Sequence, residues 1–299
     1  MSRESIRKTA RTARLGALIS ALTLLSYPAY AQNTRNDTLE VTFIQCGKAD
    51  SILLRQGEYT LLIDTATREE APRVIDKLKE EGIERLDALL ITHEHKDHIG
   101  GGSLLLEALD VGCVYMNPYC EGGNKPAGLF TDALADRNLI PVPLLAGDTF
   151  PLGLARVTVL SPEVSGWRDA NDASIVVRVD FTDTSFLFMA DAADMPVHEM
   201  LTSGTAFHNL RAHVVKVPHH GRAFELADVF FSAVRPEIAV ITCGSADDEP
   251  PDSGVLNAIE QTGARLFLTR DGDIKIVSDG YHLTVNLMTS LDVNGSDAP

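Results

Sequence analysis

The chain has 299 residues, 44% of them hydrophobic, and a net charge of −16. This composition is ordinary for a globular protein, and the length is enough for one large core or two small ones. We expect one domain, residues 39–290, because no Pro/Ser-rich linker or short repeat interrupts the chain after residue 38. The acidic charge disfavours polyanionic partners such as nucleic acid, since like charges slow association.

The first 31 residues have the three parts of a cleaved secretory signal. Five basic residues precede an apolar stretch at 15–25, and small residues at the end of 28–31 provide a cleavage site. The apolar stretch is shorter than the about 20 residues of a bilayer-spanning helix; an uncleaved membrane anchor is the alternative. Cleavage would remove five basic residues and one acidic residue, leaving a periplasmic or secreted protein of charge −20 without a membrane span. Residues 32–38 are expected to be a linker and residues 291–299 a disordered tail.

Next along the chain comes a predicted β-meander, followed by alternating helices and strands. Alternating apolar residues predict strands at 39–43, 51–55 and 59–64. Helical spacing of Val74, Ile75 and Leu78 predicts a helix at 69–81 that ends at Gly82. Further along, we expect a buried strand at 86–91, a short helix at 104–109, strands at 156–160, 175–180 and 185–189, and a helix at 253–262.

Directly after the strand at 86–91, four metal-capable side chains fall within six residues. They are His93, His95, Asp97 and His98. Burying such polar groups without partners costs roughly 2–7 kcal/mol each, and a divalent cation removes that cost. The spacing therefore predicts a metal site at a strand end, with residues 100–102, three glycines, allowing the backbone to turn before the next helix.

Four cysteines would meet an oxidising compartment after export. Cys113 and Cys120 are close enough in sequence to form a disulfide, although spacing alone does not fix the pairing. Zinc binding by cysteines is disfavoured because no C-x-x-C spacing occurs. Cys46 is expected to be a small buried residue.

The pattern H-x-H-x-D-H after a buried strand resembles the signature of the metallo-β-lactamase superfamily. Residues 61–65, 188–191 and 215–221 resemble its other motifs, in the same order. The turns at 45–50 and 171–174, together with the run 217–221, resemble the hydrolase domain of ComEC-type competence proteins and their secreted relatives. The resemblance implies an α/β fold, a four-layer α/β/β/α sandwich, with the site at a shared edge of strand ends.

The resemblance also implies two divalent metal ions about 3.5–4 Å apart, with a water or hydroxide between them as the nucleophile. The first ion would be held by His93 and His95, the second by Asp97 and His98 with either His219 or His220, and both by a bridging Asp191. Asp64 would support the site from behind, and Asp97 is the candidate catalytic residue.

One departure from the family pattern concerns the first ion. No histidine lies between His98 and Asp191, where many members supply a third imidazole. Asn171 or Asp172 is the possible third ligand, with Ser174 nearby; the alternative is an ordinary turn. Oxygen ligands favour harder ions, so manganese or magnesium is a candidate beside zinc.

These features together predict a secreted metallohydrolase acting on a small phosphodiester or phosphate ester. Lys48 and Arg222 are either phosphate contacts or solvated surface charges. Acidic residues at 247–249 would repel polyanions near the site. The alternatives are a lactam, lactone or thioester hydrolase on the same fold, and a non-catalytic binding module stabilised by metal. The remaining histidines, His198, His208, His213 and His282, have no ligand partners at useful spacing.

Overall fold

The computed structural model describes residues 37–119, 123–163, 169–202, 210–245 and 249–289. The predicted signal peptide, the tail and the Cys120 end of the predicted disulfide lie outside these ranges. Within them, no helix combines the length and the apolar character needed to cross a bilayer.

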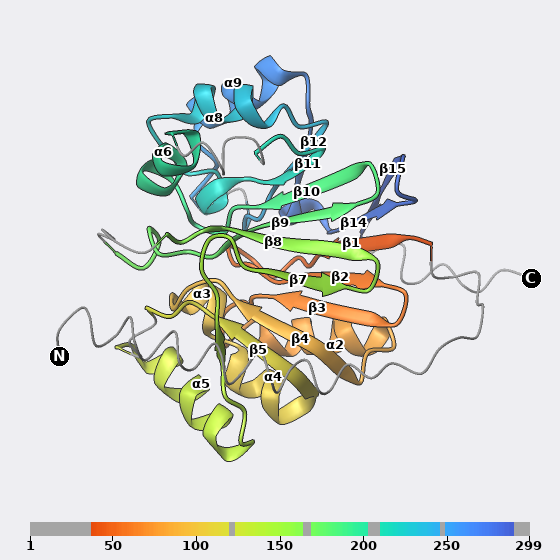
Figure 1. The fold of residues 1–299 in the computed structure, drawn as a ribbon, viewed down its shortest axis with the longest axis vertical. Coiled ribbons are helices and arrows are strands. Elements are labelled where there is room, and N and C mark those ends of the chain that lie inside the picture. Colours follow the sequence, from red (N-terminus) through yellow and green to blue (C-terminus); the bar gives the residue numbers. More distant parts are fainter. Residues whose placement is uncertain (1–36, 120–122, 164–168, 203–209, 246–248, 290–299) are drawn as a thin grey trace, which may run out of the picture.

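The first of two sheets contains eight strands in the order β15-β14-β1-β2-β3-β4-β5-β6 (Figure 1). Its strands are β1 (Leu39–Phe43), β2 (Ile52–Gln56), β3 (Tyr59–Ile63), β4 (Arg85–Ile91), β5 (Asp110–Met116), β6 (Val142–Pro143), β14 (Asp273–Ser278) and β15 (Leu283–Met288). The meander β1-β2-β3 is antiparallel, whereas β3, β4, β5 and β6 run parallel. The parallel strands need crossover connections, and helices supply most of them.

The second sheet contains seven strands in the order β13-β12-β11-β10-β9-β8-β7. Its strands are β7 (Thr149–Leu152), β8 (Ala155–Ser161), β9 (Val176–Phe181), β10 (Thr184–Phe188), β11 (Val214–Lys216), β12 (Ile238–Ile241) and β13 (Arg265–Leu268). Strands β10, β11, β12 and β13 are parallel. Each sheet therefore has a parallel half.

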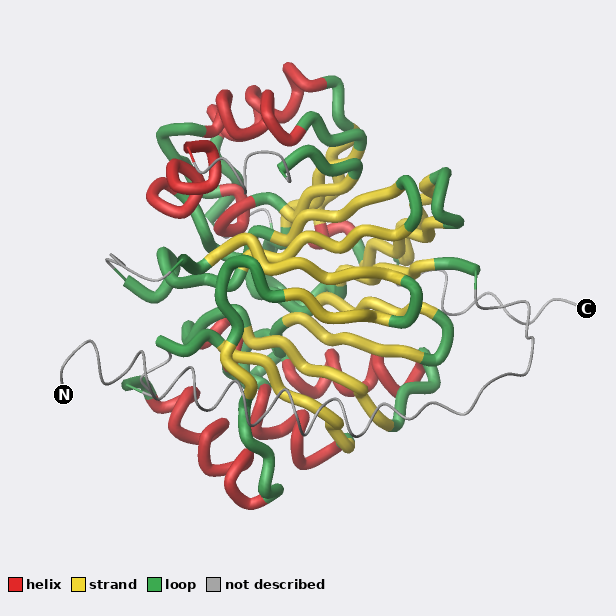
Figure 2. The backbone as a smooth tube through the Cα atoms, viewed as in Figure 1, coloured by secondary structure: helices red, strands yellow, loops and turns green. Residues whose placement is uncertain are grey.

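Helices cover the outer face of each sheet (Figures 1 and 2). The described α-helices are α2 (Ala71–Glu80), α3 (Lys96–Ile99), α4 (Gly102–Ala108), α5 (Lys125–Asp136), α6 (Asp194–Thr202), α8 (Ala227–Val234) and α9 (Ser253–Thr262). Two 3-10 turns, η1 (Pro218–Gly221) and η2 (Thr269–Asp271), complete the set. Helices α2, α4 and α5 lie on the first sheet, and α6, α8 and α9 on the second.

Three buried apolar clusters confirm the four-layer sandwich. One fills the space between the sheets and includes Phe43, Val177 and Phe188. The other two each join one sheet to its helices. Burial of apolar area is the main force in folding, so the layers follow from strands that are apolar on both faces.

Several predicted elements agree closely with the structure. Strand β1 and helix α9 have the expected bounds, and Asp252 caps α9 by accepting hydrogen bonds from Gly254 N and Val255 N. The glycines at 100 and 101 lie in the predicted turn, between α3 and α4, but they do so without unusual backbone angles. Gly101 has nearly helical angles (φ −82°, ψ −9°), and a Cβ there would collide with the carbonyl oxygen of Thr65. The glycine thus permits close packing rather than an unusual backbone angle.

The parallel strands place the candidate residues at one edge. In α/β sheets, ligands bind beyond the carboxyl ends of parallel strands. Strands β3 and β4 end at Ile63 and Ile91, directly before Asp64 and the segment that starts at Thr92. Strands β10 and β11 of the other sheet end shortly before Asp191 and the two histidines at 219 and 220.

Candidate metal centre

The structure brings most of the candidate ligands together in two neighbouring groups. One group contains Asp97, His98, Asp191 and His220, and the other contains His93, His95 and Asp191. Within each group the candidate ligand atoms lie within 4.8 Å of one another. The two groups share Asp191.

The two carboxylate oxygens of Asp191 face different groups. Oδ1 lies 3.3 Å from His98 Nε2 and 3.5 Å from His220 Nε2. Oδ2 lies 3.9 Å from His93 Nε2 and 3.6 Å from His219 Nε2. The adjacent histidines at 219 and 220 therefore approach opposite oxygens of the same carboxylate, which the sequence pattern could not reveal.

Buried ring and carboxylate atoms at this centre fit a metal site. His98 Nε2, His220 Nε2 and Asp191 Oδ1 are buried and make no hydrogen bond within the described part of the chain. Buried polar atoms nearly always have a hydrogen-bond partner or a bound ion. Three such atoms without a partner in one cluster therefore indicate that the site binds an additional group. Imidazole nitrogens and carboxylate oxygens are the donors that divalent transition metals prefer.

Burial and neighbouring charges shift the protonation of these groups. Burial alone would lower the pKa of His98, but the Asp191 and Asp64 carboxylates outweigh it and raise that pKa well above the usual value. Burial likewise opposes ionisation of Asp191, yet His98 and His220 hold its pKa well below normal. At His93 burial dominates, and with His98 it lowers the pKa well below that of a free histidine.

The backbone around the centre adopts conformations that non-glycine residues rarely take. Positive φ angles occur at Asp64 (60°), Ala190 (47°), His219 (46°) and His220 (55°). Such angles cost about 1–3 kcal/mol each, and they persist where surrounding structure enforces them, often at functional sites. Because residues 219 and 220 are both left-handed, the chain turns sharply enough to present two adjacent rings to Asp191.

Asp64 contacts His98 through the ring nitrogen that faces away from Asp191. Its Oδ2 is 2.7 Å from His98 Nδ1, and its two oxygens also accept hydrogen bonds from the backbone and hydroxyl of Thr92. A carboxylate on the far nitrogen of a metal-binding histidine fixes the ring orientation and its tautomer. Nε2 of His98 is left to face Asp191.

The structure does not place the predicted third ligand of the first ion in either group of candidate ligands. Asn171 and Asp172 line the adjacent cavity rather than joining either group of candidate ligands. Ser174 is buried, with its Oγ 3.4 Å from His93 Nδ1, on the side of the ring away from Asp191. His219 instead lies near the oxygen of Asp191 that faces His93.

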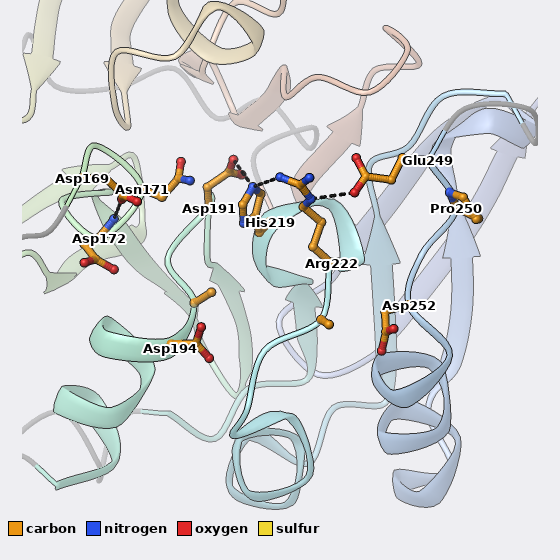
Figure 3. A pocket seen from close by; sticks show the side chains of 12 residues that line it. Asp169, Asn171, Asp172, Asp191, Asp194, His219, Arg222, Glu249, Pro250 and Asp252 are labelled. Atoms are coloured by element: carbon orange, nitrogen blue, oxygen red, sulfur yellow. Dashed lines mark hydrogen bonds and ion pairs between the residues drawn. The ribbon is translucent and has the colours of Figure 1, made fainter.

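A cavity of about 480 Å³ opens beside the centre (Figure 3). Asp191 and His219 lie at its middle, and Arg222 points across it toward Glu249. Glu249 pairs with Arg222 (Nε to Oε1, 2.8 Å) and with Lys48. Both candidate phosphate contacts are thus held by one carboxylate. The cavity wall carries more carboxylates than cations, its charged members being Asp169, Asp172, Asp191, Asp194, Arg222, Glu249 and Asp252.

The described histidines that were not expected to be ligands lie in neither ligand group. His213 Nδ1 lies 2.9 Å from the hydroxyl of Ser185, and His282 contacts Asp279. His198 also belongs to neither group in the described chain, and His208 lies outside the described residues. Asp247 and Asp248 of the predicted acidic loop lie outside them too.

Three buried residues behind the centre were given no individual role in the sequence interpretation, although two of them lie within motifs that it used. They are Asp50, Lys216 and Thr242, all excluded from solvent. Lys216 carries the one signal that the sequence offered, because a lysine within the apolar run 214–217 is seldom buried without a partner. Asp50 and Thr242 have no such signal.

Comparison with known proteins identifies the family. Residues 44–244 match the model of the metallo-beta-lactamase superfamily. The chain is 26% identical over 197 residues to ComE operon protein 3 of Bacillus subtilis (strain 168), covering 66% of this chain and 25% of that protein. It is 28% identical over 232 residues to Competence protein ComA of Neisseria gonorrhoeae, covering 77% and 30% respectively. The chain therefore spans less than a third of the length of these relatives.

A solved structure shows the same fold. The metallo-beta-lactamase fold protein YhfI from Bacillus subtilis aligns with a TM-score of 0.53 and 14% identity, over 80% of this chain and 99% of that chain. Members of this superfamily typically depend on two metal ions. The chain belongs to the metallo-β-lactamase superfamily of metal-dependent hydrolases and is similar to competence proteins of the ComEC type.

Proposed function

We propose that this protein is a binuclear metallohydrolase that cleaves small phosphodiesters or phosphate esters. The observation that carries the proposal is the division of Asp191 between two groups of ligand atoms, Oδ1 with His98 and His220, Oδ2 with His93. Two ions held there would polarise a phosphoryl oxygen and lower the pKa of a water molecule toward about 7, so no serine or cysteine nucleophile is needed.

Individual side chains have distinct proposed roles. His93 and His95 would hold the first ion, and Asp97, His98 and His220 would hold the second, each group together with Asp191. Asp97, with its side chain 26% exposed, is the member of the second group with access to a substrate and to the attacking water. Two ions also suit the in-line displacement at phosphorus, because they stabilise both the attacking and the leaving oxygen.

His219 and Arg222 are the proposed substrate contacts in the cavity. His219 is 21% exposed; burial lowers its pKa, and His220 and Arg222 add to this effect against the pull of Asp191. It is therefore neutral at pH 7 and can offer Nε2 to the first ion or to the substrate. Arg222, whose Nη1 lies 3.4 Å from His219 Nε2, can bind a phosphate oxygen once Glu249 is displaced.

The carboxylates of the cavity wall favour small substrates over nucleic acid. A polyanion brings more negative charge to this surface than a single diester does, and like charges slow association. The proposed metal is zinc, because the ligand set is rich in imidazole, with manganese and magnesium as alternatives. We further propose that residues 1–31 direct export to the periplasm or beyond, which mass measurement of the processed N-terminus after cell fractionation would test.

The substrate class is tested by comparing kcat/KM for bis(p-nitrophenyl) phosphate, a DNA oligomer and nitrocefin. Protein loaded with zinc and protein loaded with manganese should both be assayed. We expect the small diester to be the best substrate and DNA to be poor. A clear preference for nitrocefin would overturn the substrate class while leaving the metal site intact. No turnover by protein with two bound ions would favour the binding module.

A further inference from the structure

A buried chain of polar contacts links three elements directly beneath the second group of ligands. Lys216 lies at the end of β11, Asp50 in the loop between β1 and β2, and Thr242 directly after β12. Lys216 Nζ is 2.6 Å from Asp50 Oδ2, and Thr242 Oγ1 donates to Asp50 Oδ1 over 2.6 Å. Asp50 follows a strand of the first sheet, and the other two residues belong to the second sheet or follow one of its strands. These polar contacts therefore connect the two sheets behind the centre.

This series of polar contacts ends at the imidazole of His220. Nδ1 of that ring lies 3.0 Å from the carbonyl oxygen of Thr242 and 3.0 Å from its hydroxyl oxygen. A carbonyl oxygen only accepts, so Nδ1 must carry the hydrogen. In the neutral ring, the form that binds a metal ion, Nε2 then has a free lone pair, and it is this atom that lies 3.6 Å from Asp97 Oδ2 and 3.5 Å from Asp191 Oδ1.

Asp50 determines which way the threonine hydroxyl points. An ionised carboxylate only accepts hydrogen bonds, so the hydroxyl hydrogen of Thr242 is directed to Asp50 and its oxygen is left as a second acceptor for His220 Nδ1. Without Asp50, that hydroxyl could turn its hydrogen toward the ring and oppose the required tautomer.

Lys216 explains how a carboxylate can be buried in this position. A buried charge is tolerated only when it is paired and hydrogen-bonded. Lys216 Nζ also donates to the carbonyl oxygen of Ala190 over 2.8 Å and lies 3.8 Å from Asp191 Oδ1. The ammonium group thus balances Asp50 and anchors the strand end that delivers Asp191.

We propose that Lys216, Asp50 and Thr242 form a positioning relay that fixes the tautomer and orientation of His220 for the second ion. The relay would do for His220 what Asp64 does for His98. This inference rests on the two-ion site of the proposed function. It predicts that damage to the relay weakens the second ion selectively, because within the described residues the hydrogen bonds and ion pairs of the relay reach His220 and Asp191 Oδ1 but not His93 or His95.

The test measures zinc affinity directly, without an activity assay. Zinc binding to wild type, Asp50→Asn, Thr242→Val and Thr242→Ser is followed by competition with a chromophoric chelator. Asp273→Asn is the matched control, because Asp273 is a buried carboxylate paired with Lys77 (3.4 Å) and Arg73 (2.9 Å) outside the ligand groups. Histidine tautomers in the zinc-free proteins are read from long-range ¹H–¹⁵N correlation spectra.

We expect Asp50→Asn to weaken the second zinc ion by about 10- to 100-fold, as is typical for outer partners of metal ligands, with the first ion unchanged. Thr242→Val should weaken the second ion by about tenfold, since the carbonyl acceptor remains, whereas Thr242→Ser and Asp273→Asn should bind like wild type. His220 should be protonated at Nδ1 in the wild type.

Two results would overturn the relay. One is second-ion affinity within about twofold of wild type in both Asp50→Asn and Thr242→Val. The other is equal weakening of both ions in these variants, which would indicate a general structural role. If Asp50→Asn does not fold, the Thr242 pair decides the question. A wild-type protein that binds at most one ion would overturn the proposed function and the relay together.

Discussion

Asp97→Ala should impair turnover strongly while leaving the stability of the metal-free protein nearly unchanged. The side chain is 26% exposed, and its Oδ2 lies 3.6 Å from His220 Nε2. The backbone carbonyl of residue 97, which accepts a hydrogen bond from Asp50 N over 3.0 Å, is untouched by the substitution. We therefore expect the unfolding free energy of the metal-free protein to change by no more than about 1 kcal/mol.

The effect on turnover should be far larger. Asp97 and Asp191 are the two carboxylates of the second group, so the variant loses half of the negative charge that holds the second ion. Removing one preorganised electrostatic contribution to a transition state costs about 10²–10³ in kcat, or about 2.7–4 kcal/mol. Loss of an ion should cost at least as much.

Three measurements on one preparation check this prediction. They are the melting temperature without metal, the zinc content, and kcat/KM for bis(p-nitrophenyl) phosphate. The melting temperature should fall by no more than about 2–4 °C. Asp76→Ala, the same substitution at an exposed position of α2, is the control and should behave as wild type. A folded Asp97→Ala protein with near-native activity would refute the binuclear mechanism.

The remaining predictions concern the neighbouring histidines, the cavity and pH. His220→Ala should lose the second ion, whereas His219→Ala should retain it; equal zinc contents would contradict the division between the Asp191 oxygens. Arg222→Ala should raise KM for the diester by about tenfold with little change in kcat, since a hydrogen bond to a charged group contributes about 1.5–3 kcal/mol. Glu249→Gln should lower KM, because it frees Arg222 to bind the phosphate. Unchanged KM values in both variants would exclude a contact between Arg222 and the substrate. Because the pKa of His98 is raised, the metal-free ring is charged at neutral pH and must lose a proton when the second ion binds, so affinity should rise with pH. Calorimetry in buffers with different ionisation enthalpies should detect that proton, and identical heats would disprove its release. In the metal-free protein the charged His98 ring contributes fully to the unfolding free energy below about pH 6.5, the pKa of a free histidine. This contribution should decrease as the pH rises through the pKa of the folded protein. An unfolding free energy that does not change with pH over that range would contradict the prediction.

The sequence predicted the fold well where local pattern and burial agree. Strand β1 and helix α9 were located to the residue, because alternating apolar residues mark the strand and Gly263 marks the end of the helix. The H-x-H-x-D-H run was recognisable because four metal-capable side chains follow a buried strand without a break. These signals are local, so one chain suffices to read them.

Other features depend on contacts that no local pattern contains. The different positions of the His219 and His220 rings depend on two successive left-handed residues, which turn the rings to opposite oxygens of Asp191. Asp50 meets Lys216 and Thr242 across 166 and 192 positions of the chain. Their contact follows from the stacking of the two sheets, and single-sequence reasoning has no access to that register.

The central claim is that two ions lie on either side of Asp191. The most direct test is a crystal structure of the zinc-loaded protein with anomalous data collected at the zinc edge. We expect two peaks about 3.5–4 Å apart, one bound by His93 and His95 and the other by Asp97, His98 and His220, with one oxygen of Asp191 on each. A single peak, or two peaks of which neither contacts Asp191, would contradict the account.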